Sequence, residues 1–207
     1  MRASRPMKLR LCAGLLALVA TCSAHAETPP VQAATCVACH GAQGLGNPAL
    51  GAPRLAGQQA EYLVTQLRDF KAGRRGYAPG DSHGAQMRAI ATLLGDSDQA
   101  LLARYFADLG ATSSAASLAP DAPGQALYQG TCAACHGPRG EGFAHLKTPN
   151  LRLLDRAYLD RQLTAFSEGA RGSERHGSEL AIWMRGIALQ LHDGEQRRLL
   201  LDYIASP

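Results

Sequence analysis

The motif C-x-x-C-H occurs twice in this chain, at Cys36–His40 and at Cys132–His136. In an exported protein, two thiols at this spacing can add to the two vinyl groups of one haem, and the adjoining histidine can then bind the iron. C-x-x-C also occurs in redox dithiols and zinc sites, but a dithiol needs no histidine and zinc-binding cysteine pairs lie roughly 12–20 residues apart. Here the whole stretch 40–131 separates the two pairs. The sequence therefore predicts two covalently bound haems, attached at Cys36, Cys39, Cys132 and Cys135.

The first 26 residues have the pattern of a secretory signal peptide. Four basic residues precede the apolar run Leu11–Ala20, and Ala24-His25-Ala26 fits a cleavage site. The apolar run is shorter than the roughly 20 residues that a membrane-spanning helix needs. We expect a periplasmic mature protein that starts near Glu27 and has no transmembrane segment. Cys22 leaves open a lipid anchor, and with it a peripheral membrane association, although Thr21 fits such a signal poorly.

Cleavage after Ala26 changes the counts on which the functional interpretation depends. Two of the six cysteines are lost, so those that remain all belong to the C-x-x-C-H motifs and none is left for a structural disulfide. Of the 4 methionines, only Met87 and Met184 remain. Lys plus Arg falls from 21 by the four lost basic residues, which leaves about as many cations as the 17 Asp plus Glu. A chain near neutrality gives no reason to expect nucleic acid as a partner.

The two halves of the chain are copies of one unit. An offset of 96, the distance from Cys36 to Cys132, aligns them for about fifty residues without a gap. Further on, an offset of 97 aligns Met87 with Met184 and Asp96 with Asp193. Between the copies lies a stretch rich in Ala, Ser and Pro, which is typical of a linker. We therefore predict a signal peptide at 1–26, a first domain at 27–109, a linker at 110–123 and a second domain at 124–207.

Both domains are expected to be all-α, because no stretch alternates as a strand does. Met87 and Met184 are predicted to open helical turns, and Asp96 and Asp193 to be N-caps of the last helix in each half. The other predicted helices are Val31–Thr35 and Gln125–Thr131, which carry the motifs at their ends, and the amphipathic segments Gln59–Lys71 and Arg156–Glu168. Domains of about 85 residues are marginal on a side-chain core alone, so we expect the haem to complete each core.

The iron ligands follow from the motifs and the repeat. His40 and His136 are predicted to bind one side of each iron because each directly follows its cysteine pair. For the other side, Met87 and Met184 are preferred, since they are aligned in the repeat and lie at nearly equal distances after those histidines. A lone methionine is ordinarily core filler. The other candidates are His83, Gln86, His176 and His192, of which His176 stays open as an alternative for the second iron.

The arrangement resembles the dihaem class I cytochromes c of the cytochrome c4 type over almost the whole mature chain. The resemblance implies two haem c, each wrapped by one of two tandem class I cytochrome c domains. It is carried by the stretches Cys36–Gly41, Pro53–Gln58, Tyr62–Leu67 and Met87–Ala91 and their counterparts in the second half.

The resemblance also implies a role for Pro53 and Pro149. Their carbonyl oxygens would accept a hydrogen bond from the outer ring nitrogens of His40 and His136, which would orient these ligands. The second half departs from the family pattern between Asn150 and Arg156, where Ala-Gly-Gln is missing.

Two haems with His and Met on the iron favour electron transfer over catalysis. Such an iron is six-coordinate, offers no open position to a substrate, and has a raised potential. We therefore expect no enzyme, but a carrier of single electrons between a quinol-oxidising complex or a dehydrogenase and a terminal oxidase or reductase. Two alternatives remain: a dedicated cytochrome subunit of a dehydrogenase complex, and a dihaem peroxidase, which needs an open or displaceable position on one iron.

Overall fold

The computed structural model describes residues 29–109, 122–191 and 193–205. In these ranges the regular structure is helical, and the one extended pairing is an isolated bridge between Asn47 and Ala52. The prediction of an all-α protein is therefore confirmed. The expected signal peptide, most of the linker and His192 fall outside the described residues. No helix within the described ranges is long and apolar enough to cross a bilayer.

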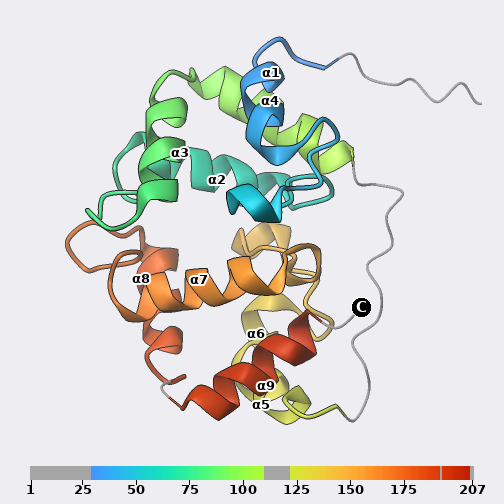
Figure 1. Ribbon diagram of the computed structural model, residues 1–207, viewed down its shortest axis with the longest axis vertical. Helices are drawn as coiled ribbons and strands as arrows, with labels where there is room; N and C mark the ends of the chain where they lie inside the picture. Colours follow the sequence, from blue (N-terminus) through green and yellow to red (C-terminus); the bar gives the residue numbers. More distant parts are fainter. Residues whose placement is uncertain (1–28, 110–121, 192, 206–207) are drawn as a thin grey trace, which may run out of the picture.

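The first domain is built from four α-helices and a short 3-10 turn. These are α1 (Ala33–His40), η1 (Pro48–Leu50), α2 (Ala60–Lys71), α3 (Ser82–Thr92) and α4 (Asp96–Asp108). Helix α2 packs against both α3 and α4, and Figure 1 shows α1 beside α4 at the far end of this domain. The apolar side of α2 contributes Tyr62, Leu63 and Phe70 to the buried residues, as its amphipathic pattern predicts.

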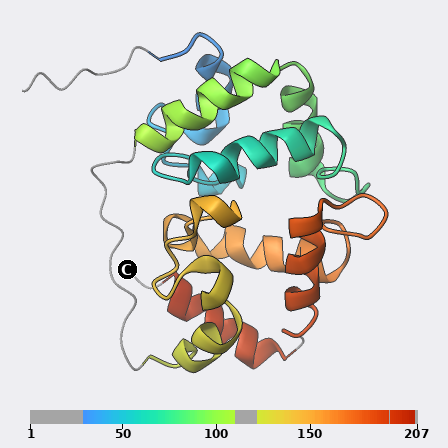
Figure 2. The same ribbon diagram turned by 180° about the vertical axis from the view of Figure 1, so that it is seen from behind.

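The second domain repeats this plan. Its elements are α5 (Gln125–Thr131), α6 (Ala133–His136), η2 (Ala144–Leu146), η3 (Leu151–Leu153), α7 (Arg156–Ser167), α8 (Glu179–Ala188) and α9 (Gly194–Ile204). Helix α7 packs against α8 and α9, as α2 does against α3 and α4. The core brings Tyr128 of α5 together with Phe166 of α7 and Leu200 of α9. Figure 2 shows the two domains stacked, with α2 and α7 facing each other between them.

Some predicted helix boundaries are wrong, and the hydrogen bonds of the chain explain why. Met87 does not open a helical turn: α3 begins at Ser82, because the Asp81 side chain accepts a hydrogen bond of 2.8 Å from the Gly84 N–H. Met184 likewise lies inside α8, which starts at Glu179.

The expected caps of the last helices differ between the two halves. In the first half Asp96 is already helical and Gly95 is the N-cap, its N–H donating to the Asp98 side chain at 3.2 Å. In the second half Asp193 is the N-cap, as predicted, and accepts a hydrogen bond of 2.8 Å from the Glu195 N–H.

The domain interface contains the position at which the two halves differ in sequence. Gln58 is 1% exposed; its Nε2 donates to the Asn150 carbonyl at 3.0 Å and its Oε1 accepts from the Asn150 N–H at 2.6 Å. The repeat places Leu154 where the first half has Gln58. The Ala-Gly-Gln segment of the first half, which the second half lacks, therefore contains the residue through which the first domain contacts Asn150 of the second. Further bonds join Arg161 to the Gly51 carbonyl and Ser178 to Asp69.

Candidate haem sites

A cavity of about 980 Å³ lies mainly in the first domain and is lined on one side by residues of the second domain, such as Tyr158 and Gln162. This volume is at the upper end of the roughly 300–1,000 Å³ range of cofactor sites. The residues lining it include Cys36, Cys39 and His40 on one side and Met87 on another, with Leu67 and Phe106 among the apolar ones. A large, mostly apolar cavity that has two thiols and an imidazole on its wall fits a covalently attached haem.

His40 ends helix α1 and is held in one orientation from the loop that follows. Its side chain is 5% exposed, and its Nδ1 lies 2.7 Å from the carbonyl oxygen of Pro53. Burial lowers the pKa of His40, and the Pro53 carbonyl opposes this effect. The imidazole is therefore neutral at pH 7, with Nδ1–H donating to Pro53 and Nε2 left free to bind a metal. This is the bond that the family resemblance implies.

The loop after His40 turns back on itself at Gly46. Its N–H donates to the His40 carbonyl at 2.8 Å, and its φ of 88° lies in the left-handed region. A Cβ at this position would lie 2.8 Å from the Arg54 nitrogen and 3.0 Å from the Pro53 carbonyl carbon. Gly46 therefore allows the Pro53 segment to approach His40.

Replacing Gly46 with alanine is expected to destabilise the first domain by on the order of 1–3 kcal/mol, because the positive φ and the new contacts both strain the loop. The displaced loop would also loosen the bond between Pro53 and His40. Thermal unfolding of the holoprotein measures the loss. Gly80→Ala is the control, since nothing lies within 4 Å of a Cβ at that position. Equal melting temperatures for the two variants would contradict this account.

The four cysteines of the motifs form no disulfide with one another. Cys36 is half-buried, and burial raises its pKa. Cys132 is buried; burial, with a smaller contribution from Cys135, raises its pKa to about 11. Cys39 and Cys135 are exposed. The described residues contain no group of three or more His, Cys, Asp or Glu side chains that could hold a metal ion.

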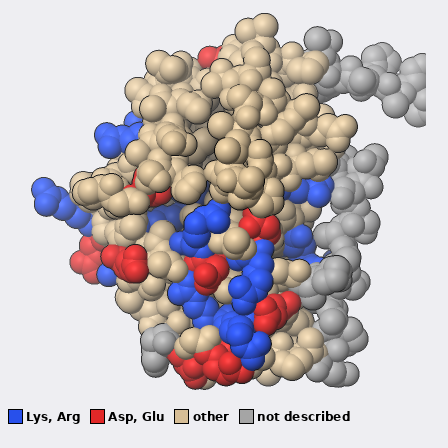
Figure 3. All heavy atoms as spheres, in the orientation of Figure 1, with Lys and Arg blue, Asp and Glu red and all other residues tan. Residues whose placement is uncertain are grey.

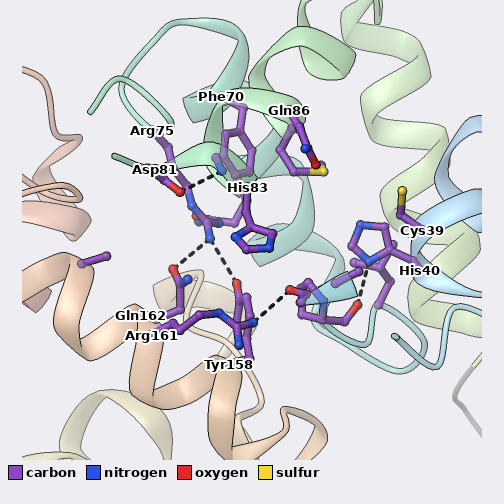
Figure 4. A pocket seen from close by; sticks show the side chains of 18 of the residues that line it. Cys39, His40, Phe70, Arg75, Asp81, His83, Gln86, Tyr158, Arg161 and Gln162 are labelled. Carbon is purple, nitrogen blue, oxygen red and sulfur yellow. Dashed lines mark hydrogen bonds between the residues drawn. The ribbon is translucent and has the colours of Figure 1, made fainter. Parts of the chain in front are cut away.

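The wall of the cavity opposite α1 is formed by α3. Met87 is half-buried there, while His83 and Gln86 are more exposed. Figure 4 shows His83 and Gln86 on this side and Cys39 with His40 across from them. The three candidates that the sequence proposes for the other side of the first iron thus lie in one cavity. A Cβ added at Gly51 would lie 2.8 Å from His83 Nε2, so the His83 ring rests against the backbone of the η1 loop.

The second domain places the equivalent residues in the same order, with looser geometry around its histidine. His136 is 8% exposed, and its Nδ1 lies 3.4 Å from the Pro149 carbonyl oxygen, longer than the bond in the first domain. Burial lowers the pKa of His136 as well. Met184 packs against the hydrophobic core of this domain. His176, the alternative ligand, stacks on Tyr77 of the first domain with ring centroids 4.5 Å apart, so its ring is engaged at the interface.

The model of the cytochrome c family matches this chain twice, at residues 30–110 and 122–206. The chain belongs to the cytochrome c family. It is 36% identical to cytochrome c4 of Pseudomonas aeruginosa, over 81% of this chain and 83% of that protein. It is 33% identical to a thiosulfate dehydrogenase electron acceptor of Thiomonas intermedia, over 100% of this chain and 95% of that protein.

The crystal structure of reduced cytochrome c4 from Pseudomonas stutzeri matches with a TM-score of 0.64 and 34% identity, covering 84% of this chain and 93% of that one. The chain is therefore a dihaem protein of the cytochrome c4 type with two haem c, an electron-transfer protein and not an enzyme. The peroxidase alternative thereby loses its support.

Sequence reasoning missed the residues of the domain interface. Gln58, Asn150, Tyr77 and Arg161 contact the other domain. Gln58 ends one of the stretches that carry the family resemblance, but the sequence predicted no role for any of the four. One signal was available for Gln58, since it stands in the only family segment that the second half lacks. Arg161 also lines the first-domain cavity from the second domain, as Figure 4 shows, and Thr65 stands at the matching position of the first half.

Proposed function

We propose that this protein is a periplasmic carrier that takes single electrons from a dehydrogenase and delivers them to a terminal oxidase or reductase. The observation that carries the proposal is the similarity, over nearly the full length of both chains, to a protein named as the electron acceptor of thiosulfate dehydrogenase. That similarity favours a periplasmic dehydrogenase as the donor over a quinol-oxidising complex. We further propose that residues 1–26 are removed on export and that the domains span 27–109 and 124–207, joined by the linker at 110–123.

The ligand assignment is part of this proposal. Cys36 and Cys39 would hold the first haem by thioether bonds, and Cys132 and Cys135 the second. His40 with Met87, and His136 with Met184, would bind the two irons. When bound in this way, each haem iron takes up and releases one electron.

The surrounding chain would keep these ligands in place. The Pro53 carbonyl, 2.7 Å from His40 Nδ1, holds that ring in its tautomer, and Pro149 would do the same for His136. Apolar residues such as Leu67 and Phe106 line the first cavity and exclude water from it. A closed position on each iron leaves electron transfer as the available chemistry.

The surface fits a carrier that meets protein partners. In the view of Figure 3, Lys and Arg mix with Asp and Glu over the second-domain half, while the first-domain half is mostly uncharged. The mixture of charges on this face creates no large positive field there, and a positive field is the feature that attracts nucleic acid. The two halves of this face differ, so different partners could dock on the two domains.

The donor is tested by mixing the oxidised holoprotein with a purified thiosulfate dehydrogenase and thiosulfate, and following the visible band of reduced haem by stopped flow. We expect both haems to be reduced at a rate that rises with the dehydrogenase concentration. If dithionite reduces both haems but the dehydrogenase reduces neither, this donor is wrong and a quinol-oxidising complex becomes the next candidate.

The same two proteins distinguish a free carrier from a dedicated subunit of the dehydrogenase. The subunit is a second candidate because the Thiomonas relative is named as the electron acceptor of one particular dehydrogenase. A free carrier would elute apart from the dehydrogenase in size-exclusion chromatography and would be reduced catalytically by a small amount of enzyme. Co-elution at a fixed ratio, with reduction limited to that ratio, would identify a bound subunit instead.

A further inference from the structure

The η1 loop (residues 47–52) ends directly before Pro53, whose carbonyl oxygen lies 2.7 Å from His40 Nδ1. Asn47 and Ala52 exchange both of their backbone hydrogen bonds, at 2.8 and 3.0 Å, so the loop is closed at its base. Proline has a fixed φ, so little rotation is possible between the loop and the Pro53 carbonyl. The position of the η1 loop therefore constrains the oxygen that orients His40.

The second domain holds this loop through one side chain of α7. Arg161 Nη2 donates to the Gly51 carbonyl oxygen at 3.0 Å, and Figure 4 shows Arg161 reaching from α7 toward the first-domain cavity. The guanidinium also lies over the Tyr158 ring, with its Cζ 5.8 Å from the ring centroid. Arg161 thus connects the second domain to the segment that orients His40 in the first.

Gly51 is confined from two sides. Its φ of 65° lies in the left-handed region. A Cβ at this position would lie 2.8 Å from His83 Nε2 and 3.2 Å from Arg161 Nη2. The tip of the η1 loop is therefore held between α3 of its own domain and α7 of the second domain.

The repeat has no equivalent of this contact in the opposite direction. It places Thr65 where the second half has Arg161, and Lys147 where the first half has Gly51. The Thr65 hydroxyl donates to a carbonyl of its own helix at 2.7 Å. Within the described ranges, no side chain of the first domain donates a hydrogen bond to the matching loop 143–148. Only the first domain has its loop held by the other domain.

The second domain anchors its proline in another way. The Thr148 hydroxyl donates to a backbone carbonyl of the haem motif at 2.7 Å, and Gln58 bonds to Asn150 on the far side of Pro149. There the distance from His136 Nδ1 to the Pro149 carbonyl oxygen is 3.4 Å. The shorter contact between histidine and proline thus occurs in the domain whose loop is held by an arginine of its neighbour.

We propose that Arg161 is a positioning residue for the first iron, which holds Gly51 so that the Pro53 carbonyl stays at hydrogen-bond distance from His40 Nδ1. A ring N–H bonded in this way fixes the tautomer and makes the imidazole a stronger ligand. The docked second domain thereby takes part in orienting a ligand of the first iron. The proposal rests on the ligation of that iron by His40, which is part of the proposed function, and on no redox partner.

Arg161→Thr tests the proposal by introducing the residue found at the equivalent position of the first half. The readout is the His40 Nδ1–H in proton–nitrogen NMR spectra of the reduced holoprotein, whose low-spin ferrous haems are diamagnetic. We expect this proton to exchange with solvent on the order of tenfold faster, which is the factor that one hydrogen bond of ordinary strength contributes to an equilibrium. The Nδ1–H of His136 should keep its wild-type rate.

Arg161→Lys is the conservative variant. Lysine keeps the charge and one donor of similar reach, so it should restore most of the protection of His40. The potential of the haem is a poorer readout, since losing the charge of Arg161 lowers it whereas a weaker bond between His40 and Pro53 raises it. If Arg161→Thr does not mature, Arg161→Gln replaces it, because glutamine is too short to reach the Gly51 carbonyl from α7.

Two control variants separate this role from general loosening of the molecule. Ser178→Ala removes another bond between the domains, the one with Asp69 at 2.7 Å. Arg156→Gln removes an exposed arginine from the same helix. Both should leave the exchange of His40 unchanged. Wild-type exchange in Arg161→Thr would overturn the proposal, and so would equal acceleration in Ser178→Ala or an equal loss in Arg161→Lys.

The wild-type spectrum tests the ligation by itself. An imidazole bound to a haem iron has its carbon-bound ring protons shifted strongly upfield by the ring current of the haem. We expect this shift for His40 in the wild type and in Arg161→Thr. Its absence in the wild type would refute the ligation and the proposal with it. If the shift is present but the Nδ1–H does not respond to Arg161→Thr, the ligation stands and the role of Arg161 is refuted.

Discussion

Replacing Met184 with leucine is expected to leave one of the two haems high-spin and to lower its potential by on the order of 100 mV, part of the roughly 0.8 V range that axial ligands span. Leucine has no lone pair to give to iron. It has nearly the volume of methionine, so the core against which Met184 packs should stay intact. The long-wavelength absorption band of methionine-bound ferric haem should fall to about half.

Three variants control this experiment. Met87→Leu should produce the same change at the other haem, and the double variant should lose the band entirely. His176→Ala should leave the spectrum unchanged, because the His176 ring stacks on Tyr77. If Met184→Leu has the wild-type spectrum while His176→Ala gains a high-spin fraction, then His176 is the ligand of the second iron.

Replacing Cys36 and Cys39 together with serine is expected to halve the haem content and to unfold the first domain. Without the haem, the cavity of about 980 Å³ would remain. At about 24 cal/mol per Å³ of empty cavity, keeping it dry would cost on the order of 20 kcal/mol, more than the roughly 5–15 kcal/mol by which a whole domain is stable. The domain should therefore open and admit water.

Haem content per chain and hydrogen exchange of the amides in α2, α3 and α4 measure this outcome. The matched variant replaces Cys132 and Cys135 with serine and should transfer the loss to α7, α8 and α9. If the first domain kept slow exchange without its haem, the view that haem completes the core would be wrong. Full haem content in either variant would show that these thiols are not the attachment points.

The haem motifs and the repeat were readable from the sequence because the chemistry they encode is local. Five consecutive residues contain both thiols and the histidine, so no tertiary information was needed to predict two haems. The alignment of Met87 with Met184 came from the repeat, and the matching Ile-Ala that follows each of them supported it. The amphipathic pattern of 59–71 and 156–168 likewise predicted α2 and α7 to within one residue at each end.

Helix ends were less predictable because several residues near each end could act as caps. Asp96 and Asp98 are both residue types that cap helices well. The observed bond between the Asp98 side chain and the Gly95 N–H shows that Gly95 is the cap, so α4 begins at Asp96, the residue that was expected to precede it. In the same way Asp81, in a stretch rich in Gly and Arg, caps α3 and places Met87 in the interior of that helix.

Taken alone, the sequence determined the cofactor, the number of domains and the ligands to test, because these follow from a local motif and from the match between the two copies of the repeat. Only the tertiary structure decided how the copies face each other. Gln58 meets Asn150, and Arg75 meets Arg171 through two shared glutamines. These pairs are more than ninety positions apart. The repeat makes Arg75 and Arg171 equivalent in sequence, but nothing in the sequence shows that equivalent residues touch. They meet because α2 and α7 face each other between the domains (Figure 2), where Gln66 of α2 and Gln162 of α7 each bond to both arginines. This docking is a property of the two domains together and of neither one alone.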